Sequence, residues 1–251
     1  MERETYAPGT PCWVDIGSTD LDVTHAFYGG LFGWDHEDAG PVEETGGYGF
    51  YLKDGKQIAG YGPAQAPGVW WSCYVSVDDA AATAGKVELN GGTTVVAPME
   101  VGAKGSMAVF ADPTGAPFSV WQPGEHWGSE VVNEAGAFSW SELMTRDLPA
   151  AVAFYQAVFG WTEKNGPDAP YKEFEVDGNV IAGGQAIAPE MPAQVPAHWN
   201  VYFGTSDVDA AAAKVTELGG MVRVPPFDIP GTGRVAICGG PHHEGFSLFG
   251  F

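Results

Sequence analysis

Residues 13–34 read WVDIGSTDLDVTHAFYGGLFGW, and residues 140–161 read WSELMTRDLPAAVAFYQAVFGW. Both stretches contain a tryptophan, an Asp-Leu pair, a Phe-Tyr pair and a closing Phe-Gly-Trp, in one register 127 residues apart (147 − 20). A register shared by so many residue types indicates an internal duplication. The chain is therefore expected to contain two related clefts, and differences at matched positions indicate which chemistry each cleft supports.

Each copy predicts a short strand followed by a helix. Asp20 and Asp147 stand where the helix would begin, because a carboxylate there accepts hydrogen bonds from free backbone amides. The apolar residues that follow have helical spacing, with one face buried. Gly33 and Gly160 are predicted to end the helices, since glycine tolerates the left-handed conformation that follows many helices.

Each half continues with short strands, a second strand and helix, and two closing strands. Asp54-Gly55 and Asp177-Gly178 favour tight hairpins between two of these strands. The second helices end at Gly91-Gly92 and at Gly219-Gly220, now 128 residues apart (219 − 91). Each half therefore predicts two β-α-β-β-β modules.

The predicted fold is α+β, with four such modules forming two curved mixed sheets that carry helices on their outer faces. We expect residues 1–122 to form the first half, residues 123–136 a polar linker, and residues 137–251 the second half. A curled sheet of paired modules leaves a cup lined by alternate strand residues.

Composition excludes several classes of partner. The formal charge is −21, from 11 basic and 32 acidic residues, so neither nucleic acid nor an anionic membrane is an expected partner. Cys12, Cys73 and Cys238 lie far apart, which fits a reducing compartment, and no apolar run approaches the ~20 residues that span a bilayer. The sequence predicts a cytoplasmic protein, either a monomer or a weak homodimer.

At this point the motifs resemble those of a known superfamily. The pattern Asp-Leu-x5-Phe-Tyr-x3-Phe-Gly-Trp, the second unit ending in Gly-Gly, and the turn at residues 112–115 (DPTG) are similar to the vicinal oxygen chelate superfamily. That group contains glyoxalase I, extradiol dioxygenases, and bleomycin- and fosfomycin-resistance proteins. The Trp-x7-Leu opening looks most like a tandem actinobacterial glyoxalase-like subgroup. The resemblance covers nearly the whole chain but does not select one activity, because one fold hosts many.

The resemblance also implies where a metal ion would be held. Metal-dependent members take ligands from the first strand of each module and from the closing strand after the Asp-Pro-x-Gly turn. Divalent ions need carboxylates, imidazoles or thiolates to replace their hydration. The sequence therefore predicts no metal and no other cofactor, because the matched positions hold Trp13, Ser72 and Ser119 in the first half and Trp140, Asn200 and Ser247 in the second.

Two carboxylates keep other chemistry open. Asp15 and Glu142 occupy matched positions, on the same strand face as Trp13 and Trp140. They could bind an amine or hydroxyl of a ligand, act as general acid or base if burial raises their pKa, or seat a displaced metal. The structural alternative is that each caps a backbone amide or stays solvated.

The histidines are weaker candidates. His242-His243-Glu244 replaces the first half's Asp-Pro-x-Gly turn, and we interpret it as a solvated turn because adjacent strand residues face opposite sides. His198 precedes Asn200 and could approach the second cup. His25, His36 and His126 lack matched partners and are interpreted as surface residues.

Aromatic and small polar side chains are expected to line the cups. Such a lining is typical of sites for flat aromatic molecules, and the acidic surface would suit neutral or cationic ligands. For Trp13, Tyr74, Trp140 and Tyr202 a place in the ordinary core is the alternative. The expected lining further comprises Ser72, Ser119 and Trp121 in the first cup and Asn200, Ser247 and Phe249 in the second.

Three hypotheses follow. The first is metal-independent binding of a small aromatic or polyketide-like molecule, in an antibiotic-resistance or secondary-metabolite accessory role. The second is a tailoring enzyme that uses Asp15 or Glu142 as acid or base. The third is a metal-dependent enzyme of the glyoxalase or dioxygenase kind, so the sequence leaves open whether any reaction is catalysed.

Overall fold

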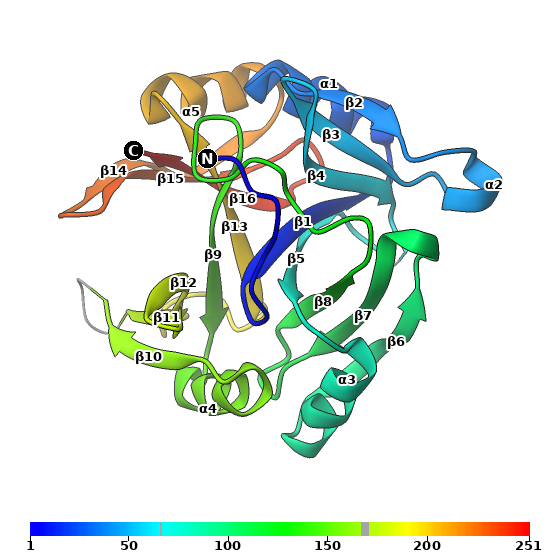
Figure 1. Cartoon of the computed structure of the whole chain (residues 1–251). Coiled ribbons are helices and arrows are strands. Elements are labelled where there is room, and N and C mark those ends of the chain that lie inside the picture. The colour runs from blue at the N-terminus through cyan, green and yellow to red at the C-terminus, as the bar shows by residue number, and fades with distance from the viewer. Residues whose placement is uncertain (66, 167–170) are drawn as a thin grey trace.

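The computed structural model describes residues 1–65, 67–166 and 171–251 (Figure 1). The first half contains β1 (Pro11–Ser18), α1 (Leu21–Phe32), β2 (Asp35–Asp38), α2 (Val42–Thr45), β3 (Gly49–Lys53), β4 (Lys56–Pro63), β5 (Trp70–Ser76), α3 (Ala80–Leu89), β6 (Thr93–Glu100), a short 3-10 helix (Gly102–Lys104), β7 (Gly105–Ala111) and β8 (Pro117–Pro123).

The second half repeats this order, without counterparts of α2 and the 3-10 helix among the described residues. It contains β9 (Phe138–Thr145), α4 (Leu148–Phe159), β10 (Thr162–Asn165), β11 (Lys172–Val176), β12 (Asn179–Ala186), β13 (His198–Thr205), α5 (Val208–Glu217), β14 (Met221–Ile229), β15 (Gly233–Gly239) and β16 (Gly245–Gly250).

Each half forms one mixed sheet of eight strands. The strand order is β2-β3-β4-β1-β5-β8-β7-β6 in the first sheet and β10-β11-β12-β9-β13-β16-β15-β14 in the second. The two orders are equivalent strand for strand, which confirms the α+β fold of four β-α-β-β-β modules. β8 ends at Pro123 and β9 begins at Phe138, so we retain residues 1–122 and 137–251 as the proposed halves.

Local chemistry sets the helix ends as the sequence predicts. The side chains of Asp20 and Asp147 accept hydrogen bonds from the backbone amides of Val23 and Ala150, the third residue after each. Gly33 and Gly160 both adopt φ of 73°, the left-handed conformation that ends a helix at low cost for glycine.

The two sheets pack against each other through the faces that carry the helices. α1 contacts α5, and α3 contacts α4, so helices of opposite halves meet in pairs (Figure 1). One core cluster includes Tyr28 and Phe246, with ring centroids 5.8 Å apart. The other includes Phe118 and Tyr155, 5.5 Å apart. Each core thus joins side chains of both halves, and the opposite faces of the two sheets point away from this seam.

Two reciprocal hydrogen-bond chains cross the seam. Trp71 Nε1 donates to the Tyr28 hydroxyl (2.8 Å), which donates to Glu244 Oε1 (2.9 Å). In the matched chain, Trp199 Nε1 donates to the Tyr155 hydroxyl (2.9 Å), which donates to Asp112 Oδ2 (3.1 Å).

Glu244 is only 2% exposed, so the interpretation of residues 242–244 as a solvated turn is wrong for this side chain. The segment does form a turn. The carboxylate of Glu244 is buried at the seam, where it accepts a hydrogen bond from the hydroxyl of Tyr28 of the first half.

The segment that joins the halves is not merely a polar tether. Val131 and Val132 are 4% and 5% exposed and belong to one of the two cores. Ser129 Oγ donates to the carbonyl of Ile58 (2.8 Å), and the amide of Ser129 donates to the carbonyl of Cys12 (2.8 Å). The joining segment is therefore packed against the first sheet. None of the helices in the described ranges is long and apolar enough to cross a membrane.

Candidate functional site

The face of each sheet that points away from the helices carries the predicted site residues. Residues paired directly across neighbouring strands share a face. In the first sheet such a row contains, in order, Glu37, Phe50, Gly60, Asp15 and Ser72. In the second sheet the matched row contains Lys164, Glu173, Gly183, Glu142 and Asn200.

An adjacent row completes each face. It contains Trp13, Tyr74 and Ser119 in the first sheet and Trp140, Tyr202 and Ser247 in the second. Strand alternation adds Trp121 to the first face and Phe249 to the second. The predicted site residues of each half therefore share one face, which we call the first cup (residues 1–122) and the second cup (residues 137–251).

In the first cup, a buried carboxylate holds two tyrosines. Asp15 Oδ2 accepts hydrogen bonds from the hydroxyls of Tyr74 (2.7 Å) and Tyr48 (3.2 Å). The Tyr48 hydroxyl in turn accepts from Trp13 Nε1 (2.9 Å). The carboxylate of Asp15 is thus engaged by the protein itself.

The second cup repeats most of this network with a longer acid. Glu142 Oε2 accepts a hydrogen bond from the Tyr202 hydroxyl (2.7 Å), and Trp140 Nε1 donates to the Tyr171 hydroxyl (3.0 Å). Asn200 Nδ2 donates to Ser247 Oγ (2.8 Å), a pair that joins two of the predicted site residues directly.

Each network requires a glycine beneath a tyrosine. A Cβ on Gly60 would lie 2.0 Å from the Tyr48 hydroxyl, and one on Gly183 would lie 1.8 Å from the Tyr171 hydroxyl. Both separations are far below van der Waals contact. The tyrosines reach their positions only because these two strand residues have no side chain.

Burial dominates the electrostatics of both cups. Asp15 and Glu142 are 8% and 5% exposed, and loss of hydration raises the pKa of each carboxyl. Hydrogen bonds from neighbouring hydroxyls partly offset this effect. Burial, together with the nearby carboxylate of Glu142, also raises the pKa of Tyr171 and Tyr202.

The first cup is filled by side chains of this chain. The His126 ring lies edge-on to Trp13, with centroids 4.6 Å apart, and within 5.8 Å of the rings of Trp121 and Phe50. The Trp121 indole donates to the carbonyl of His126 (2.7 Å), which fixes the loop that carries it. Trp13 is consequently only 4% exposed.

The prediction that His126 is a surface residue is therefore wrong. The aromatic rings around it explain its position, because a neutral imidazole packs favourably against them. Burial, aided by the positive charge of Lys104, lowers the pKa of His126 to about 4. The imidazole is neutral at pH 7.

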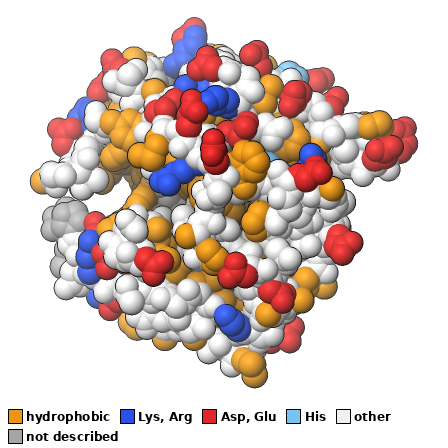
Figure 2. Space-filling model, viewed as in Figure 1, with side chains coloured by type: hydrophobic (Ala, Val, Ile, Leu, Met, Phe, Trp, Pro, Cys, Tyr) orange, Lys and Arg blue, Asp and Glu red, His pale blue; other side chains and the backbone are white. Residues whose placement is uncertain are grey.

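The second cup is more open. Trp140 and Phe249 are partly exposed, whereas their counterparts Trp13 and Trp121 are buried. Within residues 1–65, 67–166 and 171–251, no aromatic ring packs on Trp140. Figure 2 shows a hollow at the left of the molecule, between the region of β14 and β15 and that of β10 to β12.

The donor set of neither cup fits a divalent metal ion. The positions from which metal-dependent relatives would take ligands hold indole, hydroxyl and amide groups, and the adjacent carboxylates accept hydrogen bonds from tyrosines. No group of three or more His, Cys, Asp or Glu side chains converges in the described part of the chain.

The remaining histidines lie apart from the networks. His198 shares the face of Asn200 at the rim of the second cup, where its Nδ1 lies 2.9 Å from the carbonyl of Pro196. The rings of His25 and His36 stack on each other, with centroids 3.9 Å apart, and His25 Nδ1 lies 3.0 Å from the Tyr51 hydroxyl.

The sequence interpretation missed several residues of the two cups, among them Tyr48, Tyr171, Glu173 and His126. The first three were detectable, because Tyr171 and Glu173 lie 123 residues after Tyr48 and Phe50, the offset that also separates the two Asp-Gly turns (177 − 54). His126 lies in the joining segment, where the sequence offers no matched residue to compare.

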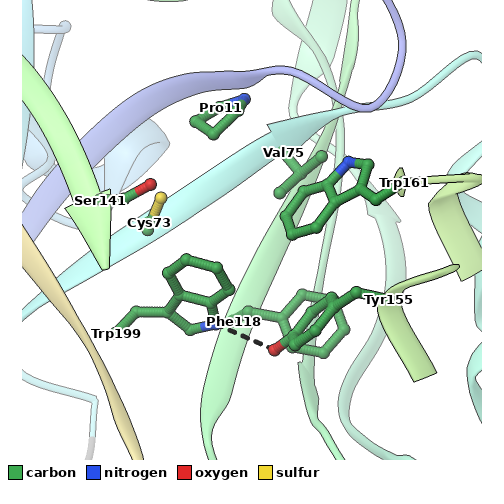
Figure 3. A pocket seen from close by; sticks show the side chains of 8 residues that line it. All are labelled: Pro11, Cys73, Val75, Phe118, Ser141, Tyr155, Trp161 and Trp199. Carbon is green, nitrogen blue, oxygen red and sulfur yellow. Dashed lines mark hydrogen bonds between the residues drawn. The ribbon is translucent and has the colours of Figure 1, made fainter. Parts of the chain in front are cut away.

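A cleft at the seam is core rather than a site. Cys73 and Phe118 of the first half meet Ser141, Tyr155 and Trp199 of the second half around it (Figure 3). Each of these five side chains is at most 7% exposed, and the Trp199 indole donates to the Tyr155 hydroxyl within the cleft. The cleft is therefore closed by the contact between the halves.

Comparison with known proteins points in one direction. The model of the Glyoxalase/Bleomycin resistance protein/Dioxygenase superfamily matches residues 137–248. The "Putative glyoxylase CFP32" of Mycobacterium tuberculosis is 39% identical, over 98% of this chain and 97% of its own length. The "Anthracycline biosynthesis protein DnrV" of Streptomyces peucetius is 38% identical, over 97% of this chain and 94% of its own.

Solved structures share the fold at low sequence identity. The Mn(II)-bound glyoxalase from Novosphingobium aromaticivorans has a TM-score of 0.67 at 16% identity, covering 96% of this chain and 82% of that one. The 2,3-dioxygenase LapB from Pseudomonas sp. KL28 has a TM-score of 0.69 at 14% identity, covering 98% and 94%.

Proposed function

Since this chain belongs to the glyoxalase, bleomycin resistance protein and dioxygenase superfamily, we propose that it binds a small, flat aromatic molecule in the second cup without a metal ion. The ligand would lie against Trp140 and Phe249, with Asn200 and Tyr202 orienting it by hydrogen bonds. The role of these side chains as a site is our proposal.

The observation that carries the proposal is the difference between the two cups. Trp13 is covered by the rings of His126 and Phe50. Its counterpart Trp140 is partly exposed, and no aromatic ring of the described residues packs against its indole. A partly exposed indole beside polar side chains is a favourable surface for an aromatic ring. The first cup already holds such a ring from within the chain.

The same comparison weakens the acid-base alternative. A pKa raised by burial suits a general acid, but the acid-tyrosine-tyrosine-tryptophan network of Glu142 recurs around Asp15. In the first cup that network lies under packed aromatic rings. A network present in both cups is more economically explained as part of the fold than as catalytic machinery.

Part of the set of relatives favours a role in secondary metabolism. One of them is named as an anthracycline biosynthesis protein, and it aligns with nearly the whole chain. We therefore propose an aromatic natural product as the ligand, held in a resistance or accessory role. The acidic surface, with its charge of −21, favours neutral or cationic molecules over anions.

A titration with 9-anthracenemethanol tests the proposal, because anthracene accepts energy from tryptophan and quenches its emission. We expect saturable quenching that is unchanged by EDTA. Trp140→Ala should weaken binding about tenfold, equivalent to ~1.4 kcal/mol. Trp70→Ala is the matched control, since Trp70 is 37% exposed and belongs to the other sheet.

Two results would overturn the proposal. One is the absence of saturable quenching by any aromatic probe. The other is binding that EDTA abolishes and a divalent metal restores. Turnover of a bound molecule that is lost in Glu142→Gln would instead support the tailoring-enzyme hypothesis.

A further inference from the structure

Several matched positions of the two cups carry different side chains. Three residues of the first cup are replaced by larger or more polar ones in the second: Phe50 by Glu173, Gly62 by Gln185, and Ser72 by Asn200. The first cup is thereby filled with rings, and the second is lined with hydrogen-bonding groups. Of these replacements, only the one at Glu173 adds a charge, and on the neighbouring edge strand Lys164 stands where the first cup has Glu37.

Glu173 points into the second cup. Its neighbour Phe174 is fully buried in the helix-side core, so alternation along β11 places Glu173 on the opposite face. Glu173 also pairs with Gly183, which in turn pairs with Glu142. The Tyr171 hydroxyl lies over Gly183, the strand partner of Glu173, and the carboxylate of Glu173 is one of the charges that raise the pKa of Tyr171.

The charge of Glu173 is only partly balanced within the protein. Lys164 is shared between two carboxylates, and its Nζ lies 2.8 Å from Glu175 Oε1 but 3.4 Å from Glu173 Oε2. The side chain of Glu173 is 23% exposed, so it is accessible from the cup. Because Lys164 lies closer to Glu175, Glu173 has the weaker ion pair of the two carboxylates.

We propose that Glu173 selects ligands that carry a protonated amine beside their aromatic system. The inference rests on the proposed function, since it assigns the aromatic part of the ligand to Trp140 and the amine to Glu173. A charge-assisted hydrogen bond between ammonium and carboxylate is stronger than one between neutral groups. The matched residue of the first cup, Phe50, offers ring contacts alone, to Trp13 (6.1 Å), Tyr48 (5.9 Å) and His126 (5.8 Å).

The test compares probes with one ring system and different charge: 9-(aminomethyl)anthracene, 9-anthracenemethanol and 9-anthracenecarboxylate. We expect the amine to bind about tenfold more tightly than the alcohol, and the carboxylate most weakly. In Glu173→Gln the preference for the amine should fall to within about twofold, while the affinity for the alcohol is kept.

Glu163→Gln is the matched control. Glu163 is 29% exposed on the adjacent strand β10 and pairs with Lys172, and its neighbour Lys164 occupies the face of Glu173. The substitution removes the same charge from the same edge of the sheet but from the opposite face. It should leave the tenfold preference unchanged.

The outcomes separate the two proposals. Equal affinities of the wild-type protein for the amine and the alcohol, or a preference that survives Glu173→Gln, would overturn the role of Glu173 and leave aromatic binding standing. If Glu163→Gln also loses the preference for the amine, the preference arises from the overall negative charge of the protein, and the role of Glu173 is overturned. Failure of all three probes to bind would overturn both proposals.

Discussion

Removal of the His126 side chain should open the first cup. In His126→Ala the imidazole leaves a space of roughly 65 Å³, and at ~24 cal/mol per Å³ of cavity the free energy of unfolding should fall by about 1.5 kcal/mol. The loop itself should stay in place, because Trp121 bonds to the backbone carbonyl of residue 126 and not to its side chain. The variant should therefore remain folded, with Trp13 and Trp121 newly accessible.

Urea unfolding followed by tryptophan emission measures the stability, and acrylamide quenching measures the exposure of the indoles. Titration with 9-anthracenemethanol should still show one equivalent bound by both proteins, because a space of roughly 65 Å³ is too small for an anthracene ring. His36→Ala is the control, since His36 is exposed and loses its ring contacts to His25 and Tyr61, which lie outside the first cup. Unchanged stability together with unchanged quenching would refute the assignment of His126 as the filling of the first cup.

Low pH should also expose Trp13 and Trp121 in the wild-type protein. The pKa of His126 is lowered to about 4, below the ~6.5 expected in the unfolded chain, so the folded state binds its proton less readily. Its contribution to stability is fully present above pH 6.5 and is lost as the pH falls toward 4. Acrylamide quenching should rise over this window in the wild-type protein and not in His126→Ala.

Three other substitutions test the networks. In Gly183→Ala the new Cβ would collide with the Tyr171 hydroxyl, so we expect a loss of about 1–3 kcal/mol in urea unfolding, partly restored by adding Tyr171→Phe. In Tyr28→Phe the indole of Trp71 and a buried carboxylate each lose a partner, and the loss should be about 1–3 kcal/mol. In Glu142→Gln the raised carboxyl pKa predicts a stability that improves relative to wild type as the pH rises from about 4, by ~1.4 kcal/mol for each unit of pKa elevation.

Each of these predictions has a contradicting result. An unchanged unfolding midpoint in Gly183→Ala would show that the tyrosine moves aside without cost. Full stability of Tyr28→Phe would mean that the chain across the seam does not stabilise the fold. A stability difference between Glu142→Gln and wild type that stays constant from pH 4 to pH 8 would contradict a raised pKa, because a shifted group must change the slope with pH.

Much of the fold could be predicted from the sequence because its signals are local. Asp20 and Gly33 mark the ends of a helix through their own backbone preferences, and Asp54-Gly55 adopts the positive φ values that a tight hairpin requires. The duplication then doubles the evidence, because every such signal recurs at a fixed offset. Strand alternation placed Asp15 with Trp13 and Tyr74 with Ser72, and the resemblance to the superfamily supplied the cup-facing side of both strands.

The sequence could not show how space is filled. Whether Trp13 is covered depends on the path of a joining segment that brings His126 back over the sheet, and no periodicity encodes that path. The burial of Glu244 likewise depends on Tyr28, which is 216 residues away in the chain. Such contacts arise from packing between segments that are distant in the chain, so local sequence patterns do not predict them.

The crossed pairing of Tyr28 with Glu244 and of Tyr155 with Asp112 has a consequence for how the molecule assembles. A fragment ending near residue 130 would lack Glu244, the hydrogen-bond partner of Tyr28, and would expose the apolar surface that packs against the second half. The complementary fragment would lack Asp112, the partner of Tyr155, and would expose the matching surface. Neither piece should fold alone, yet the two expressed together should recombine into one particle. The intact chain should unfold in a single calorimetric transition, because unfolding of either half exposes the core that it shares with the other half.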